Sequence, residues 1–369
     1  MGRKIRVLCL ASVMIISLWM QGMISVDRLL LKMISPVMYG GTDWDKSSER
    51  MHRISDRLIS MVIPMWMTQN NRLQMASKDA YELYPTDEIR ETIYEDENQT
   101  AYTVNAPVVN GQGLAYTPEM LKDYNFFLNE FYAVDSTTYA DGLLDAEKFT
   151  EMDLTMELAG DSPKILIYHT HSQEAFMDSR EGVWEDTVVG LGDRLKHELE
   201  ERYGIRVVHV TDTFDVINGV TDRSAAYTYA EEKIWEVLET YPSIKVIIDL
   251  HRDGVDESTR LVTNINGKDT AQMMFLNGLC RTSTSGPISY LQNEYLTENL
   301  AFSFKLQSKA AQYYPNLMRR IYLRSYQYNL HILPRSLLVE CGAQTNTVEE
   351  VQNAMPLLAD LLYLVLSGK

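Results

Sequence analysis

Two short segments of this 369-residue chain combine histidines with carboxylates at spacings that suit metal chemistry. His171 and Glu174 are three residues apart, which on one turn of helix or in a tight loop brings both side chains onto one face. His251 stands in the second segment, directly after an apolar run. Two histidines and one carboxylate are the protein ligands of many catalytic zinc ions, which keep a fourth position for water. We therefore predict a Zn²⁺ site held by His171, Glu174 and His251, an arrangement that resembles the ligand set of zinc carboxypeptidases.

Three nearby residues leave alternatives open at this site. His169 precedes His171 by two positions, and residues i and i+2 of a strand face the same side, so either histidine could reach the metal. Glu185 precedes a predicted helix and competes with Glu174 as the carboxylate ligand. Asp249 has the same spacing to His251, so it could accept the ring N–H of that ligand and fix its tautomer. Its alternative role is that of a buried aspartate bonded to nearby backbone.

A further carboxylate and an arginine complete the predicted chemistry. Glu340 follows an apolar run and would be costly to bury without a partner. Beside a zinc ion it would serve as the general base, taking a proton from water and returning it to the leaving amine. The alternative for Glu340 is an ion pair with Arg335 or Arg252. Arg252 would orient a substrate carboxylate or polarise a carbonyl group, or else pair with Asp253.

The elements that position these residues alternate between strands and helices after about residue 156. Apolar runs predict strands at 164–168, 205–210, 246–250, 271–276 and 336–339, and amphipathic segments predict helices at 191–203, 224–241 and 296–314. This alternation is typical of an α/β fold with a mostly parallel sheet and flanking helices. Three of the strands run directly into the ionisable residues, and ligands of such sheets bind outside the carboxyl ends of strands. For the last helix, Asn346 competes as the cap with Thr347, which has capping-box spacing to Glu350.

The N-terminal segment predicts a membrane anchor. Arg3, Lys4 and Arg6 precede an uncharged run over residues 7–26, which at about 1.5 Å per residue just crosses a bilayer core of about 30 Å. No small-residue cleavage site follows, which favours an uncleaved anchor over a signal peptide. Basic residues before the span place the N-terminus in the cytoplasm and the catalytic part outside, as in a single-pass protein of the cell membrane.

The remaining organisation follows from composition and patterning. We expect an anchor at 1–26, a membrane-proximal stalk or linker at 27–113, a small region at 114–156 packing on the catalytic domain, and the catalytic domain at 157–369. The formal net charge of −17 argues against a nucleic-acid partner, because phosphate contacts dominate such binding. With three cysteines the chain has no disulfide framework. Cys341 has no Cys–His arrangement around it, so we do not expect a thiol mechanism.

Several segments together resemble the stage II sporulation protein P family of endospore-forming bacteria. The segments that carry the resemblance are 165–176, which contains the HTHSQE sequence, 248–254, which contains DLHRD, and 338–342, with weaker similarity at 123–127 and 131–138. The resemblance covers roughly residues 115 to 365 and the anchor. Ala175 and Cys341 depart from the family pattern, but neither departure removes a predicted ligand.

The resemblance implies a membrane-anchored, zinc-dependent peptidoglycan hydrolase that acts in engulfment of the forespore. It implies N-acetylmuramoyl-L-alanine amidase activity, an accompanying endopeptidase activity on cross-links, a fold related to other cell-wall amidases, and action with stage II sporulation proteins D and M. His171, Glu174 and His251 fall in the family's metal-binding motifs, and Glu340 falls in its catalytic carboxylate motif. Two alternatives remain: a zinc carboxypeptidase or endopeptidase acting on wall peptides, and a non-catalytic wall-binding scaffold.

Overall fold

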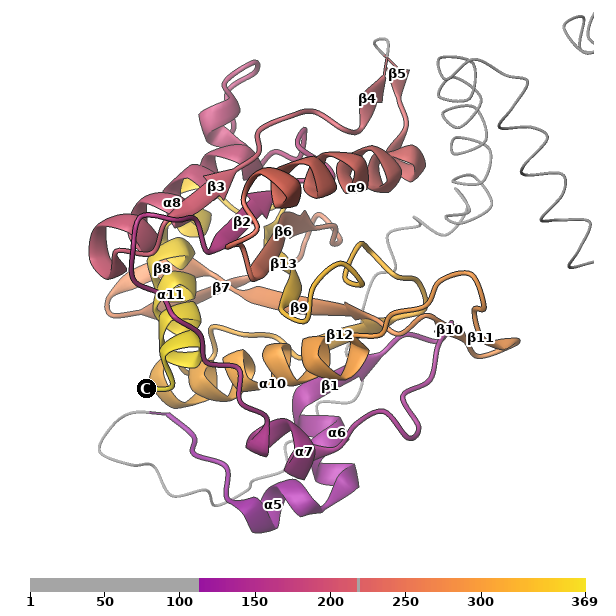
Figure 1. Ribbon diagram of the computed structural model, residues 1–369. Helices are drawn as coiled ribbons and strands as arrows, with labels where there is room; N and C mark the ends of the chain where they lie inside the picture. Colours follow the sequence, from indigo (N-terminus) through magenta and orange to yellow (C-terminus); the bar gives the residue numbers. More distant parts are fainter. Residues whose placement is uncertain (1–112, 218–219) are drawn as a thin grey trace, which may run out of the picture. The chain divides into compact units, whose positions relative to one another are not determined.

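The computed structural model describes residues 113–217 and 220–369 (Figure 1). The predicted anchor at 1–26 and the stalk as far as residue 112 lie outside these described residues. Within the described part of the chain, no helix is both long enough and apolar enough to cross a membrane.

A seven-stranded sheet with the order β1-β12-β9-β13-β6-β2-β3 forms the centre of the fold. Its strands are β1 (Tyr132–Val134), β2 (Ile165–Tyr168), β3 (Val207–His209), β6 (Val246–Asp253), β9 (Met273–Gly278), β12 (Ile321–Arg324) and β13 (Ser336–Ala343). Every neighbouring pair is parallel except β13 and β9, which run antiparallel. The prediction of an α/β fold with a mostly parallel sheet is therefore confirmed.

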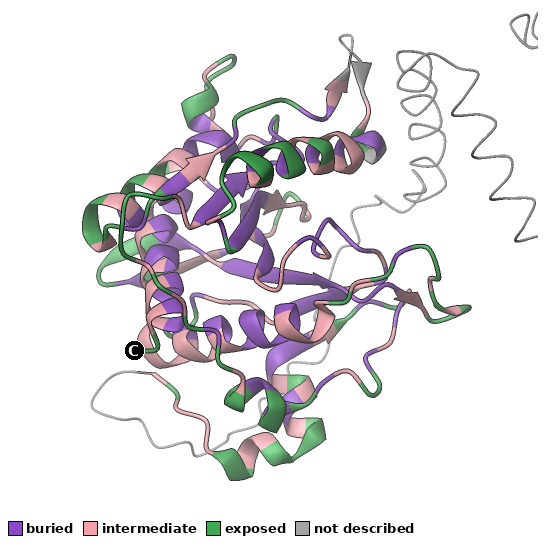
Figure 2. Ribbon diagram, viewed as in Figure 1, coloured by how far each residue is buried: buried purple, intermediate pink, exposed green. Residues whose placement is uncertain are grey.

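Helices cover both faces of this sheet. The described helices are α5 (Pro118–Lys122), α6 (Tyr124–Phe131), α7 (Ala146–Glu151), η3 (Trp184–Asp186), α8 (Val188–Tyr203), α9 (Arg223–Thr240), α10 (Leu296–Tyr313) and α11 (Val348–Ser367). Because strand residues alternate between faces, Ile248 and Leu250 pack in the cluster that α8, α10 and α11 cover, whereas Ile247 packs against α9. Figure 2 shows buried residues along the strands and on the sheet-facing sides of these helices.

Short two-stranded ribbons extend from this frame. They are β4 (Val216–Ile217) with β5 (Val220–Thr221), β7 (Val262–Ile265) with β8 (Lys268–Ala271), and β10 (Arg281–Thr282) with β11 (Gly286–Pro287). The β4–β5 ribbon leads directly into α9, and β8 packs against α11. The strands β4, β5, β10 and β11 have two residues each, which is too short to show a two-residue repeat in the sequence.

The region 114–156 contributes a strand to the sheet as well as helices. Asp123 caps α6 by accepting hydrogen bonds from the backbone N–H groups of Asn125 and Phe126. Directly after α6 the chain becomes strand β1, which pairs in parallel with β12 at the sheet edge. At the other end of the chain, Thr347 and Glu350 form the capping box of α11, while Asn346 bonds the backbone N–H of Ala343 instead. The capping-box alternative is the one that forms.

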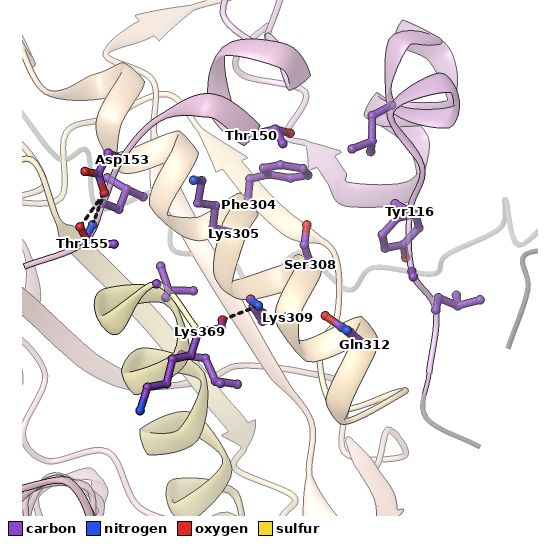
Figure 3. A pocket seen from close by; sticks show the side chains of 17 residues that line it. Tyr116, Thr150, Asp153, Thr155, Phe304, Lys305, Ser308, Lys309, Gln312 and Lys369 are labelled. Atoms are coloured by element: carbon purple, nitrogen blue, oxygen red, sulfur yellow. Dashed lines mark hydrogen bonds between the residues drawn. The ribbon is translucent and has the colours of Figure 1, made fainter. Parts of the chain in front are cut away.

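A cavity of about 380 Å³ lies beside α10 and the end of α11 (Figure 3). Tyr116 and Phe304 line it together with Lys305 and Lys309, whose ammonium groups bond the backbone oxygens of Met152 and Lys369. None of the predicted site residues lines this cavity. The predicted chemistry therefore has to be sought at the carboxyl ends of the strands.

Candidate functional site

Strands β6 and β13 place two of the predicted residues side by side. In the parallel pairing of these strands, His251 lies opposite Glu340, and Asp249 lies opposite Leu338. Alternation along β6 puts Asp249 and His251 on the face that Ile247 shares with α9. The histidine, the aspartate and the glutamate therefore meet at the carboxyl end of the sheet, on one of its faces.

The segment after β2 brings His171 and Glu174 to the same place. Strand β2 ends at Tyr168, and the chain then turns, with the N–H of Glu174 bonding the carbonyl oxygen of His171. The imidazole rings of His171 and His251 are 5.3 Å apart between centroids. The Nδ1 atom of His251 lies 3.4 Å from Oε2 of Glu174. The structure thus brings together all three predicted ligands, which are all buried.

Two carboxylates control the charge of His251. Its Nε2 atom lies 2.7 Å from Oδ1 of Asp249. Oδ1 also accepts the backbone N–H of Thr170, and Oδ2 accepts the Thr170 hydroxyl. Burial alone would lower the pKa of His251, but Asp249 and Glu174 outweigh it and hold this pKa well above its ordinary value. Asp249 thus has both contacts that the sequence suggested, one to the histidine ring and one to nearby backbone.

The pKa values of His171 and Glu174 are shifted downward, opposite to that of His251. Burial and the neighbouring His251 lower the pKa of His171 to about 3, which keeps its ring neutral. Burial would raise the pKa of Glu174, but His251 and Arg223 hold it below its ordinary value. Arg223 donates to Oε1 of Glu174 at 2.6 Å, and the backbone N–H of Arg252 donates to Oε2 at 3.0 Å. A neutral imidazole and an ionised carboxylate are the protonation states that metal binding requires.

Glu340 has no partner for one of its oxygens. Its Oε2 atom is buried and accepts no hydrogen bond from any described residue. Burial raises the pKa of Glu340 to about 8. Neither arginine named as an alternative partner pairs with it, because Arg335 bonds backbone oxygens of the segment before β2, and Arg252 bonds the backbone oxygen of Asp253. The Asp253 carboxylate pairs with Arg319 rather than with Arg252.

His169 and Glu185 lie apart from this cluster. The Nδ1 atom of His169 is 2.7 Å from the carbonyl oxygen of Leu250, and its Nε2 atom is 2.8 Å from Nε2 of His209. Both ring nitrogens are therefore engaged, and His169 faces α8, where Asp193 contacts His209. Glu185 is exposed on η3. The structure does not bring either residue next to His251.

Two residues that sequence reasoning missed contact the cluster. Asp215 is buried, and its Oδ2 atom lies 3.9 Å from Nδ1 of His171. Burial raises its pKa above the ordinary value. Arg223, at the first position of α9, bonds Glu174 as described above. Neither residue follows an apolar strand, so no pattern in the sequence marks it.

The donor set suits a zinc ion, although the side chains are not arranged around one. Within residues 113–217 and 220–369, no group of three or more His, Cys, Asp or Glu side chains is placed closely enough to hold a metal ion as it stands. The Nδ1 atom of His171 is buried and has no hydrogen-bond partner among the described residues. Two histidines, one of them neutral, and an ionised carboxylate within one cluster match the ligand types of zinc.

The fold and the site define an α/β protein with histidines and carboxylates gathered at the carboxyl ends of parallel strands. The model of the family "Stage II sporulation protein P (SpoIIP)" matches residues 61–363. The chain belongs to this family, which confirms the resemblance seen in its motifs.

Individual proteins that are similar to this chain share at most about a quarter of its residues over the aligned parts. Stage II sporulation protein P of Bacillus subtilis (strain 168) is 24% identical over 225 residues, covering 57% of this chain and 53% of that protein. The chain thus spans about half the length of the curated relative it matches. Among solved structures, the CwlV amidase catalytic domain of Bacillus (Paenibacillus) polymyxa is 12% identical, with 54% of this chain and 96% of that chain covered and a TM-score of 0.29. The Ami1 amidase of Mycobacterium smegmatis is 14% identical, with 56% and 99% covered and a TM-score of 0.34.

Proposed function

We propose that this chain is a zinc-dependent peptidoglycan hydrolase of sporulating cells that cleaves the amide bond between the muramoyl group and L-alanine. The observation that carries the proposal is the convergence of His171, Glu174 and His251 beside Glu340, from three separate segments of the sequence. Membership of the stage II sporulation protein P family supports the setting in sporulation.

Each residue of the cluster has a role in this proposal. His171, Glu174 and His251 would hold zinc, which when bound supplies a Lewis acid for the scissile carbonyl and for water. Glu340, half-buried and with a buried, unpaired oxygen, takes up a proton and delivers it to the nitrogen of the leaving amine. Arg223 keeps Glu174 ionised and fixed in orientation. The pKa of about 8 for Glu340 is its value without a metal charge nearby, and a cation would lower it.

Substrate attraction would be local in this proposal. Bacterial wall is anionic, and a chain with net charge −17 cannot attract it through its overall field. Arg252 is half-buried next to His251, and its Nε atom has no hydrogen-bond partner among the described residues. We propose that Arg252 and the bound cation supply the attraction.

The proposal extends to the location and partners of the chain. The basic residues before the apolar run at 7–26 support a single-pass anchor with the catalytic domain outside the cell membrane. Family membership supports stage II sporulation proteins D and M as partners. Protease treatment of intact protoplasts tests the orientation: the catalytic domain is expected to be digested, and protection of that domain would contradict it.

Digestion of purified cell wall tests the activity. Full-length protein with zinc is expected to release stem peptides with L-alanine amino termini and to leave the glycan strands intact, as judged by mass spectrometry. The Nε atom of Arg252, which has no hydrogen-bond partner among the described residues, also favours a second candidate, a zinc carboxypeptidase or endopeptidase that recognises a peptide carboxylate. That enzyme would shorten or separate stem peptides and leave the muramoyl–alanine bond intact. A wall-binding scaffold would yield no product.

A further inference from the structure

Asp215 and His171 face each other, and each has one buried polar atom without a hydrogen-bond partner among the described residues. Oδ2 of Asp215 lies 3.9 Å from Nδ1 of His171. Nδ1 of His171 and Oδ1 of Asp215 have no hydrogen-bond partner among the described residues. The separation is longer than a hydrogen bond, so the bond requires the two side chains to rotate toward each other. Because unpaired buried polar atoms are costly, the pair is placed to bond rather than to remain apart.

The segment that carries Asp215 reaches the cluster at two points. The backbone oxygen of Asp215 accepts from the N–H of Asp222, which closes the base of the β4–β5 ribbon. Asp222 caps α9 by accepting from the N–H of Ala225, so the next residue, Arg223, is fixed at the helix start. Arg223 then bonds Glu174. The segment from β3 to the start of α9 thus contacts two of the predicted ligands, His171 through Asp215 and Glu174 through Arg223.

We infer that Asp215 is a positioning residue for the metal site, which accepts the Nδ1–H of His171 and so leaves Nε2 of that ring for the metal. The inference rests on the zinc function proposed above. His251 has the complementary arrangement, with Nε2 against Asp249 and Nδ1 toward Glu174. Each histidine then has a carboxylate on the ring nitrogen that does not face the metal, Asp215 for His171 and Asp249 for His251. Such partners fix the tautomer and orientation of a ligating ring.

Zinc affinity measured without turnover tests this role. Full-length protein in detergent is titrated with zinc against a chromophoric chelator, for wild type, Asp215→Asn and Asp215→Ala. The matched control is Asp212→Asn, an exposed aspartate three residues earlier in the same segment. Loss of an outer carboxylate partner weakens zinc binding by about 10–100-fold. We expect that loss for Asp215→Ala, a smaller one for Asp215→Asn, which keeps an acceptor oxygen, and none for the control.

The tautomer of His171 gives a second readout that a general loss of stability would not change. In zinc-free protein labelled with ¹⁵N-histidine, we expect the His171 ring to carry its proton on Nδ1 in wild type and to become a tautomer mixture in Asp215→Ala. If Asp215→Ala does not fold, the isosteric Asp215→Asn carries the test. If the folded variants keep both the zinc affinity and the His171 tautomer of wild type, the role of Asp215 is overturned and the proposed function stands. If the wild-type protein binds no zinc, the proposed function itself is overturned.

Discussion

His251 and Glu340 lie directly opposite each other on neighbouring parallel strands, the first between two carboxylates and the second with an unpaired buried oxygen. Asp249 and Glu174 both contact the histidine, so it has two carboxylate partners without Glu340. A buried carboxyl group without a donor does not stabilise a fold. Under the proposed function, the placement of Glu340 serves chemistry at the site rather than stability.

We predict that Glu340→Gln separates activity from stability. Release of L-alanine amino termini from wall should fall by about 10²–10⁴-fold, since the amide cannot take up a proton. The free energy of unfolding should stay equal or increase, because the amide removes an ionisable group from a buried position. Denaturant melts and wall digestion measure the two effects. Glu349→Gln, an exposed change at the start of α11, is the control. Unimpaired hydrolysis by Glu340→Gln would remove the general base from the proposal.

The sequence predicted the sheet and the cluster because both depend on local signals. The apolar runs before His251 and Glu340 are long enough to identify as strands, and the carboxyl ends of parallel strands meet at one edge. Strand β1 is three residues long and follows an aromatic helix, so a single longer helix fitted the sequence equally well. Strand β12 has four residues between polar segments and was missed for the same reason.

The choice between His169 and His171 depends on where β2 ends, which periodicity does not show. The two-residue rule applies within a strand, but the chain turns directly after Tyr168. His169 therefore faces α8 and His171 faces His251. Asp215 and Arg223 could not be predicted at all, because their contacts depend on how an irregular excursion folds back over the sheet.

Zinc should stabilise the folded chain through the predicted ligands. A ligand that binds only the native state raises the free energy of unfolding by about 2.7 kcal/mol at 100 times its dissociation constant. We expect a chelator to lower the thermal midpoint of the wild-type protein and to have no such effect on His251→Ala. His197→Ala, an exposed change on α8, should respond to the chelator as wild type does. A midpoint that is insensitive to zinc in wild type would count against a metal at this cluster.

The two described cysteines should be unreactive in the native protein. Cys280 and Cys341 are both buried, and burial raises the pKa of Cys280 to about 12 and that of Cys341 further. The thiolate is the reactive form, and at pH 8 a thiol with this pKa is ionised in only about one molecule in ten thousand. Alkylation followed by peptide mapping should label both residues in urea and neither in the folded chain. Fast labelling of Cys280 without denaturant would show that its surroundings open in solution.

Gly192 should be needed for the pairing of His169 with His209. A Cβ atom at this position would lie 2.3 Å from Nε2 of His209 and 2.7 Å from Nε2 of His169. Neither ring can move aside freely, because Asp193 holds one and the carbonyl oxygen of Leu250 holds the other. Helix propensity alone would make Gly192→Ala stabilising by about 1 kcal/mol.

We expect the steric effect to exceed the propensity effect in Gly192→Ala. Overpacking a filled core costs about 1–3 kcal/mol, so urea unfolding should show a net loss of stability despite the better helix former. Glu201→Ala, an exposed change on α8, should leave stability within about 0.5 kcal/mol of wild type. Because the displaced rings adjoin the turn that carries His171 and the strand that carries His251, zinc affinity should fall as well. A stabilised Gly192→Ala with wild-type zinc affinity would show that the histidine pair does not hold this edge of the sheet.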